Sequence, residues 1–292
     1  MPTEYTDEFY RAMREGAQKS ARVIVPLVLE YVQPRSVIDL GCGIGTWLSV
    51  FREYGVTDIL GVDGDYVKKE MLEIPDDRFL KFDLRTPFRI DRQFDLVVSL
   101  EVAEHLPSEC AEVFVRTLVG LGPVVLFSAA IPLQGGTNHI NEQWPDYWAA
   151  LFKFQGYIPI DPIRRRLWQN PDADFWYVQN TLIFVQRQSL GRYPALRKEL
   201  ESADETLLSV VHPKMYLEMG RREVEKSKAE AAAYRAQAEF FAAESEKRRG
   251  EVEIYKALAE PRNMGLKKLL RALPIVAVNA MKRRRRQLLS HR

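Results

Sequence analysis

The chain has 292 residues, of which 46% are apolar and 28% charged. This composition excludes an intrinsically disordered protein and leaves room for one large domain with an appendage, or for two modest domains. Its two cysteines, Cys42 and Cys110, are too few for a disulfide framework and favour a reducing compartment. The net charge of +2 combines +10 in residues 261–292 with −8 in the remainder, so an acidic body precedes a basic end.

The N-terminal residues are polar and acidic, without the apolar stretch of a secretory signal. An apolar stripe over residues 16–30, stopped by Pro34, predicts one or two helices. The longest apolar run near the C-terminus, 269–281, is too short to span a bilayer and contains Arg271 and Pro274. We therefore expect a cytoplasmic protein.

From residue 36 to residue 186, short segments rich in β-branched and aromatic residues alternate with helical patterns. The predicted strands are 36–40, 58–62, 78–82, 94–99, 123–128, 156–160 and 180–185. Helices are expected at 46–54 and at 108–118, the second opened by Ser108. This alternation predicts an α/β fold with a doubly wound, seven-stranded and mostly parallel sheet, whose ligands bind at the carboxyl ends of its strands.

Three glycines follow the first predicted strand in the run VIDLGCGIGTW, residues 37–47. Such a turn between a strand and a helix lets the backbone approach a ligand closely and exposes helix N–H groups to it. The pattern alone does not distinguish ligands, because dinucleotide-binding proteins have a similar turn.

Acidic residues at the strand ends narrow the choice of ligand. Asp39 lies two residues before the glycines, where it would repel a pyrophosphate and favour a cationic ligand with an ammonium group. Asp63 ends the second strand, where both carboxylate oxygens could bind ribose hydroxyls. Asp83 and Leu84 end the third strand in a position suited to an adenine amino group.

The runs VIDLGCGIGTW, GVD, FDL and FDLVVSLEVAEHLP, in this order and spacing, resemble the class I S-adenosylmethionine-dependent methyltransferases over residues 20–186. The resemblance implies a Rossmann-like methyltransferase fold in which 180–185 is the antiparallel seventh strand. It also implies that S-adenosylmethionine is the cofactor. The implied cofactor-binding residues are Asp39, Gly41, Cys42, Gly43, Gly45, Asp63, Asp83 and Leu84. Cys42 is expected to be a small loop residue and not a nucleophile, since nothing near it would form a thiolate.

Residues that could activate a methyl acceptor follow the fourth and fifth strands. Glu101, Glu104 and His105 are expected on one helical turn at the mouth of the cofactor cleft, with His139 converging from the next loop. Two carboxylates and two imidazoles suit Mg²⁺ or Mn²⁺. The arrangement resembles the metal sites of small-RNA 3′-terminal ribose methyltransferases and of ubiquinone-pathway O-methyltransferases. Two alternatives stay open: His139 as a metal-free general base, and histidines that only pack or cap.

The second half of this region is rich in aromatic residues beside amides and carboxylates, as in NEQWPDYW over residues 141–148. Such surfaces suit sugar rings, although Phe152, Phe154 and Phe175 are expected in the core. The segments NHINEQWP and LWQNP resemble bacterial methyltransferases associated with polysaccharide biosynthesis. Residues 164–166, three arginines, could contact a nucleotide-sugar phosphate or form a solvated strand end.

A long helix is predicted for residues 221–260, after a linker at 191–220 that follows a methyltransferase domain at 1–190. A heptad frame starting at Val224 places seven apolar residues of the helix on one seam: Val224, Ala231, Tyr234, Ala238, Phe241, Val252 and Tyr255. Ser227, Ser245 and Arg248 weaken this seam. Self-association through a coiled coil and a solvated single helix both remain open.

The basic tail, residues 261–292, mixes ten cations with leucine, isoleucine and valine. It could bind an anionic membrane surface, which would place the protein at the inner face of the membrane, or it could bind nucleic acid or simply solubilise the chain.

Together these features predict an O-methyltransferase that acts on a sugar hydroxyl of a glycan or of its precursor. The alternatives are an RNA ribose methyltransferase, a small-molecule O-methyltransferase, a non-catalytic scaffold built on 221–260, and a dinucleotide oxidoreductase.

Overall fold

The structure is a computed structural model that describes residues 7–201 and 203–259. The chain divides into two units, Met1–Arg222 and Glu223–Arg292. Within the described residues, no helix combines the length and the apolar character that a membrane span requires. The predicted basic tail, 261–292, lies outside the described residues.

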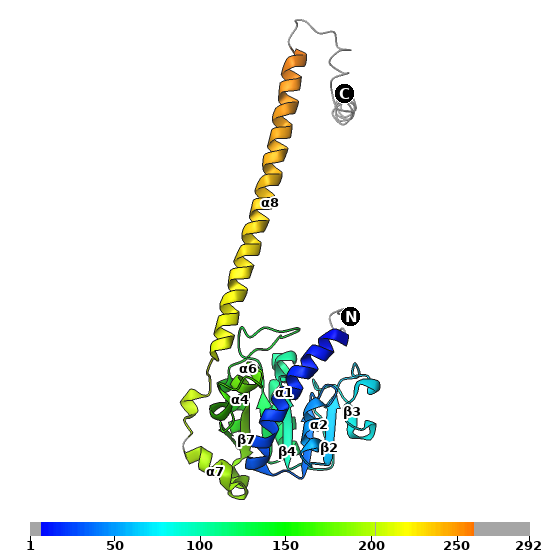
Figure 1. Cartoon of the computed structure of the whole chain (residues 1–292), viewed down its shortest axis with the longest axis vertical. Coiled ribbons are helices and arrows are strands. Elements are labelled where there is room, and N and C mark those ends of the chain that lie inside the picture. The colour runs from blue at the N-terminus through cyan, green and yellow to red at the C-terminus, as the bar shows by residue number, and fades with distance from the viewer. Residues whose placement is uncertain (1–6, 202, 260–292) are drawn as a thin grey trace. The chain divides into compact units, whose positions relative to one another are not determined.

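A seven-stranded sheet forms the centre of the first unit, with strand order β3-β2-β1-β4-β5-β7-β6. β7 runs antiparallel to both of its neighbours, whereas β1 to β5 pair in parallel (Figure 1). The strands are β1 (Ser36–Leu40), β2 (Asp58–Asp63), β3 (Phe79–Lys81), β4 (Leu96–Leu100), β5 (Val124–Ser128), β6 (Tyr157–Ile160) and β7 (Leu182–Gln186). The prediction of a doubly wound, mostly parallel sheet with an antiparallel seventh strand is therefore confirmed.

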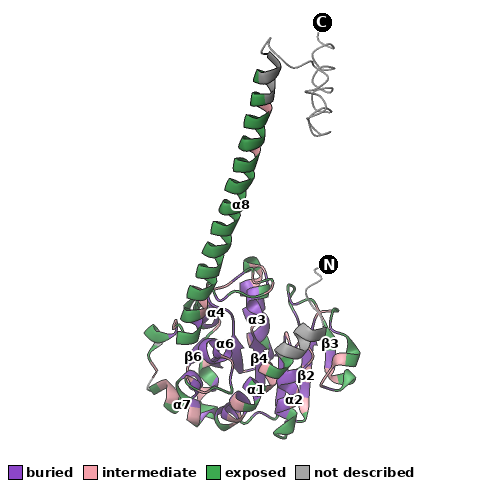
Figure 2. Ribbon diagram, turned by 45° about the horizontal axis from the view of Figure 1, so that its top comes forward, coloured by how far each residue is buried: buried purple, intermediate pink, exposed green. Residues whose placement is uncertain are grey.

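Helices cover both faces of the sheet because alternate residues of each strand point to opposite sides. In β5, Val124 and Leu126 pack in the core shared with α1 and α2, whereas Val125 and Phe127 pack in the core shared with α3 and α4. Figure 2 shows the buried residues concentrated in the strands and on the inner sides of these helices. The helices are α1 (Asp7–Val32), α2 (Thr46–Glu53), α3 (Ala111–Leu121), α4 (Pro145–Phe154), α5 (Arg164–Leu167), α6 (Phe175–Asn180), α7 (Pro194–Glu201) and α8 (Pro213–Ala259).

The helix predicted for the N-terminal region is confirmed, whereas the predicted start of α3 at Ser108 is wrong. The N-terminal region is a single helix, α1, which ends two residues before Pro34 and includes Pro26. Ser108 does not cap α3: residues Ser108–Cys110 form a separate 3-10 turn without a side-chain cap, and α3 begins at Ala111. Pro107 precedes this turn in an extended conformation, so a helix cannot start before Ser108.

Residues 191–220, expected as a linker, are part of the first unit. This stretch contains α7 and the first turns of α8, and both Leu196 and Met215 are fully buried. Leu196 joins the core that α1 and α2 share, and Met215 packs with Ile131 and Phe175. Because this stretch is largely polar in sequence, its two buried apolar residues were not predicted. Each of them lies in one amphipathic turn of its helix.

Candidate functional site

The glycine loop follows β1 at the point where the strand order reverses, between β1 and β4, which is the usual ligand site of such sheets. Gly41, Gly43 and Gly45 have φ values of 84°, 55° and 87°, in the left-handed region that favours glycine. A Cβ at Gly41 would lie 2.3 Å from Val102, and one at Gly45 would lie 2.8 Å from Ile74. A Cβ at Gly43 would meet no described atom within 4 Å. Packing thus requires two of the glycines, whereas the third borders open space that a ligand can enter.

Asp63, at the end of β2, holds this loop in place. Its Oδ2 accepts a hydrogen bond of 2.6 Å from the backbone N–H of Gly43, and its Oδ1 accepts one of 2.6 Å from Gly64. The hydroxyl of Tyr66 also donates to Oδ1. The structure therefore brings the second strand's acid and the glycine loop into direct contact.

Asp39 and Cys42 are buried beside Asp63. Burial raises the pKa of Asp39 well above its ordinary value, and the nearby charge of Asp63 raises it further. Burial also raises the pKa of the Cys42 thiol, with the charge of Asp39 adding to the effect. The raised pKa disfavours a Cys42 thiolate, in keeping with a packing role.

Asp83 lies at the surface after β3, and Leu84 beside it is buried. The guanidinium of Arg85 binds the Asp83 carboxylate, with Nη2 at 2.6 Å from Oδ2, and this pairing lowers the pKa of Asp83. The Asp83 carboxylate is therefore engaged by its own neighbour in the structure.

Glu101 differs from the other predicted acceptor-side residues because amide side chains occupy its carboxylate. It has a positive φ of 55° and lies before the 3-10 turn Ala103–His105, so Glu101 does not share a helical turn with Glu104 as expected. Its Oε2 accepts a bond of 2.8 Å from Gln134 Nε2, and its Oε1 accepts one of 3.1 Å from Asn180 Nδ2. Sequence reasoning missed both amides, which lie 33 and 79 residues further along the chain.

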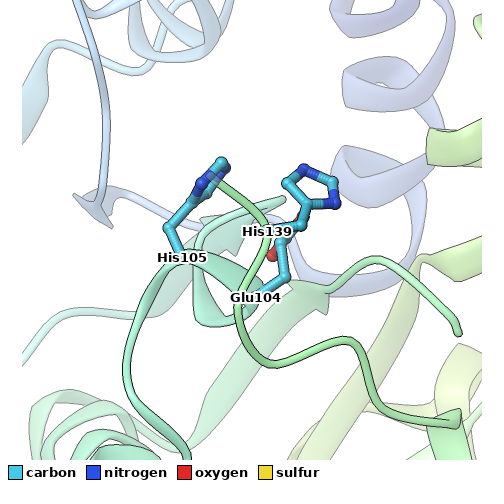
Figure 3. A group of neighbouring side chains, drawn as sticks. All are labelled: Glu104, His105 and His139. Carbon is cyan, nitrogen blue, oxygen red and sulfur yellow. The ribbon is translucent and has the colours of Figure 1, made fainter. Parts of the chain in front are cut away.

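Glu104, His105 and His139 form a group whose candidate ligand atoms all lie within 4.8 Å of one another (Figure 3). The loop that carries His139 is attached to the turn by two backbone bonds: the N–H groups of Ile140 and Asn141 donate to the Glu104 carbonyl at 2.9 and 3.0 Å. The rings of His105 and His139 meet edge to face, with centroids 4.8 Å apart. The structure thus brings together three of the four residues predicted to activate an acceptor.

Glu104 is 0% exposed, and neither of its carboxylate oxygens accepts a hydrogen bond of normal geometry within the described part of the chain. Burial raises its pKa well above the ordinary value and the charge of Glu101 raises it further, offset in part by nearby backbone N–H groups. A buried carboxylate without partners is costly unless it binds a proton or a cation. The group therefore has the electrostatic character of a cation site or of a proton-holding site.

The two histidines differ in their surroundings. His105 is exposed, yet the surrounding protein desolvates its ring in part and lowers its pKa, and the neighbouring His139 lowers this pKa further, which favours a neutral imidazole. His139 Nδ1 lies 3.0 Å from Oε1 of Glu142, and Glu142 also accepts bonds from the backbone N–H groups of Leu133 and Gly135. A carboxylate behind a histidine is the usual outer partner of a metal-ligating imidazole. In the sequence, this pairing could have been predicted from the position of Glu142 three residues after His139.

Two of the three consecutive arginines, Arg164 and Arg166, have structural roles that the sequence did not indicate. Arg164 is 2% exposed, and its guanidinium donates to the carbonyls of Gln179 and Leu208 and pairs with Asp161. Arg166 binds Glu30 on α1, with Nη1 2.6 Å from Oε2. For Arg164, the predicted phosphate contact and the predicted solvated strand end are both wrong, because this residue lies in α5 and its guanidinium donates to backbone carbonyls.

The aromatic residues divide between core and surface. Phe152 and Phe175 are buried as expected, but Phe154 is 87% exposed because it ends α4 on the outer side. Trp148 is 2% exposed and packs against Phe127, so it cannot stack on an acceptor. Of this set, Trp144 is 42% exposed and lies on the same loop as His139.

Comparison with known proteins agrees with this geometry. The family model described as a methyltransferase domain matches residues 11–160, about half of the chain. The chain belongs to the methyltransferase domain family. Together with the glycine loop, the strand order and the antiparallel β7, this membership makes it a class I methyltransferase that depends on S-adenosylmethionine, as the sequence motifs implied. Membership of this family excludes the alternative of a dinucleotide oxidoreductase.

Solved structures similar to this methyltransferase include three of distinct kinds. DesVI of Streptomyces venezuelae is 25% identical over 44% of this chain and 58% of its own, with a TM-score of 0.36. The methyltransferase domain of bacterial CtHen1 is 22% identical over 58% of this chain and 97% of its own, with a TM-score of 0.42. The sugar N-methyltransferase KedS8 from a Streptoalloteichus species is 16% identical over 64% of this chain and 94% of its own, with a TM-score of 0.48. No curated protein sequence matches the chain.

Proposed function

We propose that this methyltransferase transfers the methyl group of S-adenosylmethionine to a hydroxyl of a sugar, in a glycan or in a glycan precursor. The observation that carries the proposal is the Glu104 carboxylate, fully buried and unpaired within the described residues, beside two imidazoles at the carboxyl edge of the sheet. Glu104 and His105 follow β4, and His139 lies in the loop after β5. The glycine loop follows β1, which is the strand beside β4. An acceptor bound there would lie beside the cofactor.

A hydroxyl acceptor explains why such a group is needed. Transfer forms a bond between the acceptor oxygen and the methyl carbon while the sulfur–methyl bond breaks, and the hydroxyl proton must leave. Because the pKa of an alcohol is far above neutrality, the oxygen needs a base or a cation beside it. S-adenosylmethionine supplies the activated methyl group, so the chain's own task is to hold and activate the acceptor.

Glu104, His105 and His139 fit a divalent cation better than they fit a packing role. A carboxylate with two imidazoles is a donor set for first-row divalent metals such as Mn²⁺ and suits Mg²⁺ less well, since Mg²⁺ prefers oxygen ligands. A bound cation would satisfy the Glu104 carboxylate and lower the pKa of an acceptor hydroxyl. Glu142 would orient the His139 ring from behind.

The loop between β5 and α4 supports a sugar as the acceptor. Asn141 is 3% exposed, and its side-chain N–H₂ has no hydrogen-bond partner within the described part of the chain, although its backbone N–H is tied to Glu104. We propose that this buried amide donates to an oxygen of the bound acceptor. Trp144, three residues later, presents an exposed ring of the kind on which the C–H face of a sugar stacks.

For the cofactor, we propose that Asp63 and the Gly41–Gly45 loop carry the main contacts. Asp63 Oδ1 accepts bonds from Gly64 and from the Tyr66 hydroxyl, whereas Oδ2 accepts the bond from Gly43 and keeps a second lone pair for a ribose hydroxyl. The open space at Gly43 would receive the amino-acid end of the cofactor, whose ammonium group the buried Asp39 would favour. Leu84, buried beside the exposed Asp83, would border the adenine.

The test is transfer from methyl-labelled S-adenosylmethionine to three acceptor pools: nucleotide sugars, bacterial polysaccharide and RNA. We expect label in a sugar pool, recovered after hydrolysis as an O-methyl monosaccharide, and loss of transfer after chelation that added Mn²⁺ restores. Label found only in RNA would show that RNA, and not a sugar, is the acceptor. Label in none of the pools would contradict the glycan proposal. Full turnover after thorough chelation would show that no metal is required, and an imidazole would then be the base.

A further inference from the structure

The part of helix α8 that lies in the second unit, Glu223–Arg292, is exposed along its described length (Figure 2), and several of its exposed residues are apolar. The exposed fractions are 53% for Val224, 71% for Tyr234, 56% for Phe241 and 51% for Val252. These four residues occupy a and d positions of one heptad frame, with Val224 and Val252 at a and Tyr234 and Phe241 at d. Phe240, at a c position off this seam, is also exposed, at 66%. A seam that holds the other exposed large apolar side chains described for this unit indicates a surface for another helix.

The charges beside this seam are sorted by sign. The e positions, on one side, are basic except for Ala242: Lys228, Arg235, Arg249 and Lys256. The g positions, on the other side, are acidic except for Gln237: Glu223, Glu230, Glu244 and Glu251. No e position carries an acid and no g position carries a base over residues 223–256. A helix evolved only to stay solvated has no need of this separation.

We propose that the partner of this seam is a second copy of the chain, paired in parallel and in register over residues 223–256. In a parallel two-stranded coiled coil, each g residue faces the e residue of the next heptad on the other helix. Glu223 then faces Lys228, and Glu230 faces Arg235 of the other copy. Glu244 faces Arg249 and Glu251 faces Lys256 in the same way, so that every charged g–e contact is attractive.

Antiparallel pairing is disfavoured by the same residues. It would place e positions opposite e positions and g positions opposite g positions, which sets lysine and arginine against each other and glutamate against glutamate. The charge pattern therefore selects the relative direction of the two helices, which the apolar seam alone does not.

The ion pairs within α8 do not replace this partner. Glu225 binds Lys228 at 2.9 Å, Glu244 binds Arg248 at 3.1 Å and Glu253 binds Lys256 at 2.9 Å, all at the surface. Exposed pairs of this kind stabilise a helix weakly and leave the apolar side chains in water. Small residues on the seam, such as Ala231, Ala238 and Ser245, limit the apolar area that pairing would bury. We therefore expect a dimer that dissociates on dilution.

Charge reversal tests the partner and its direction. The full-length double variant Lys228→Glu/Arg235→Glu should weaken the dimer about tenfold or more in sedimentation equilibrium, because its g–e contacts become repulsive. The variant Glu223→Lys/Glu230→Lys should weaken it similarly, whereas an equimolar mixture of the two variants should form a heterodimer as tight as the wild type. The control Lys226→Glu/Lys247→Glu changes the same number of charges at c positions, away from the partner, and should leave the dissociation constant within about twofold.

Disulfide trapping tests the register. In a parallel, in-register pair, Ser227→Cys (d) and Ser245→Cys (a) should each cross-link to the same position of the other copy under mild oxidation. An antiparallel pair can bring at most one of these positions opposite itself. Ala229→Cys, at an f position on the far side, and the wild type with its native Cys42 and Cys110 serve as controls. A wild-type monomer at every concentration, cross-linking at only one seam position, or cross-linking of Ala229→Cys at an equal rate would overturn the proposal.

Discussion

The two acidic clusters at the carboxyl edge of the sheet differ in how their carboxylates are satisfied. Asp63, on the cofactor side, accepts hydrogen bonds from the backbone of Gly43 and Gly64 and from the Tyr66 hydroxyl. Glu104, on the acceptor side, is fully buried and accepts none of normal geometry within the described residues. Asp63 ends β2 and Glu104 follows β4, and these two parallel strands flank β1 in the same sheet.

This difference indicates two kinds of preorganisation. The cofactor side is complete without a ligand, because the chain's own N–H groups satisfy the acid and hold the loop in a binding conformation. The acceptor side is complete only when Glu104 carries a proton or contacts a cation, because an uncompensated buried carboxylate is destabilising. Substitution of Asp63 should therefore destabilise the ligand-free fold, whereas substitution of Glu104 should not.

The largest effect is expected from Glu104→Gln. Methyl transfer should fall about 100-fold or more, because the acceptor-side group loses its anionic ligand. The free energy of unfolding of the ligand-free protein should not fall, because a neutral amide replaces a carboxyl group without hydrogen-bond partners. Label transfer and urea unfolding measure the two quantities, and Glu109→Gln, an exposed position on the next turn, is the matched control. Wild-type activity in Glu104→Gln would show that this group does not activate the acceptor.

The next effect is expected from Asp63→Asn. Affinity for S-adenosylmethionine should fall about 10- to 100-fold, because charged hydrogen bonds to the ligand and to the Gly43 amide are lost. Unlike Glu104→Gln, this variant should also destabilise the ligand-free protein. Isothermal titration calorimetry measures the affinity, with the exposed neighbour Asp65→Asn as a control that should bind normally. If Asp63→Asn bound the cofactor with unchanged affinity, Asp63 would have a structural role only.

A smaller effect concerns pH and Asp39. Its pKa is raised in the folded state, so the folded protein retains a proton there that the unfolded chain has released. Stability from this residue is therefore greatest below the ordinary pKa of 3.8 and declines as pH rises toward the raised value. Relative to Asp39→Asn, the wild type should lose up to about 1.4 kcal/mol of unfolding free energy per pH unit in that window.

Urea unfolding of both ligand-free proteins, from pH 4 upward, measures this difference. Parallel pH profiles for the wild type and Asp39→Asn would show that Asp39 keeps its ordinary pKa. Adding S-adenosylmethionine should flatten the wild-type profile, because a cationic ligand stabilises the ionised carboxylate.

The smallest effect separates two glycines of one loop. Both Gly41→Ala and Gly43→Ala should cost about 1–2 kcal/mol of unfolding free energy, because each requires a left-handed backbone. Gly41→Ala should cost about 1 kcal/mol more, because its Cβ meets Val102 at 2.3 Å. Gly43→Ala should instead be distinguished by weaker cofactor binding, measured by calorimetry. Equal stability of the two variants would contradict the packing difference between these glycines.

The sequence by itself determined the features that depend on local patterns. Alternating apolar segments placed seven strands within two residues of their observed ends, and the run from Val37 to Trp47 placed the glycine loop after β1. The same local order put Glu104 and His105 side by side at a strand end, and it indicated S-adenosylmethionine. These features follow from residues close together in the chain, where backbone geometry and side-chain periodicity act directly.

Only the tertiary structure decided which side chains satisfy which others. Glu101 has the same residue type and nearly the same place as Glu104, yet Gln134 and Asn180 occupy its carboxylate while that of Glu104 stays unpaired within the described residues. Arg164 is buried against carbonyls, although nothing in its sequence neighbourhood distinguishes it from Arg165. Burial and hydrogen bonding depend on residues far apart in the chain, so the folded arrangement, and not the local pattern, determines which acid is left to bind a cation.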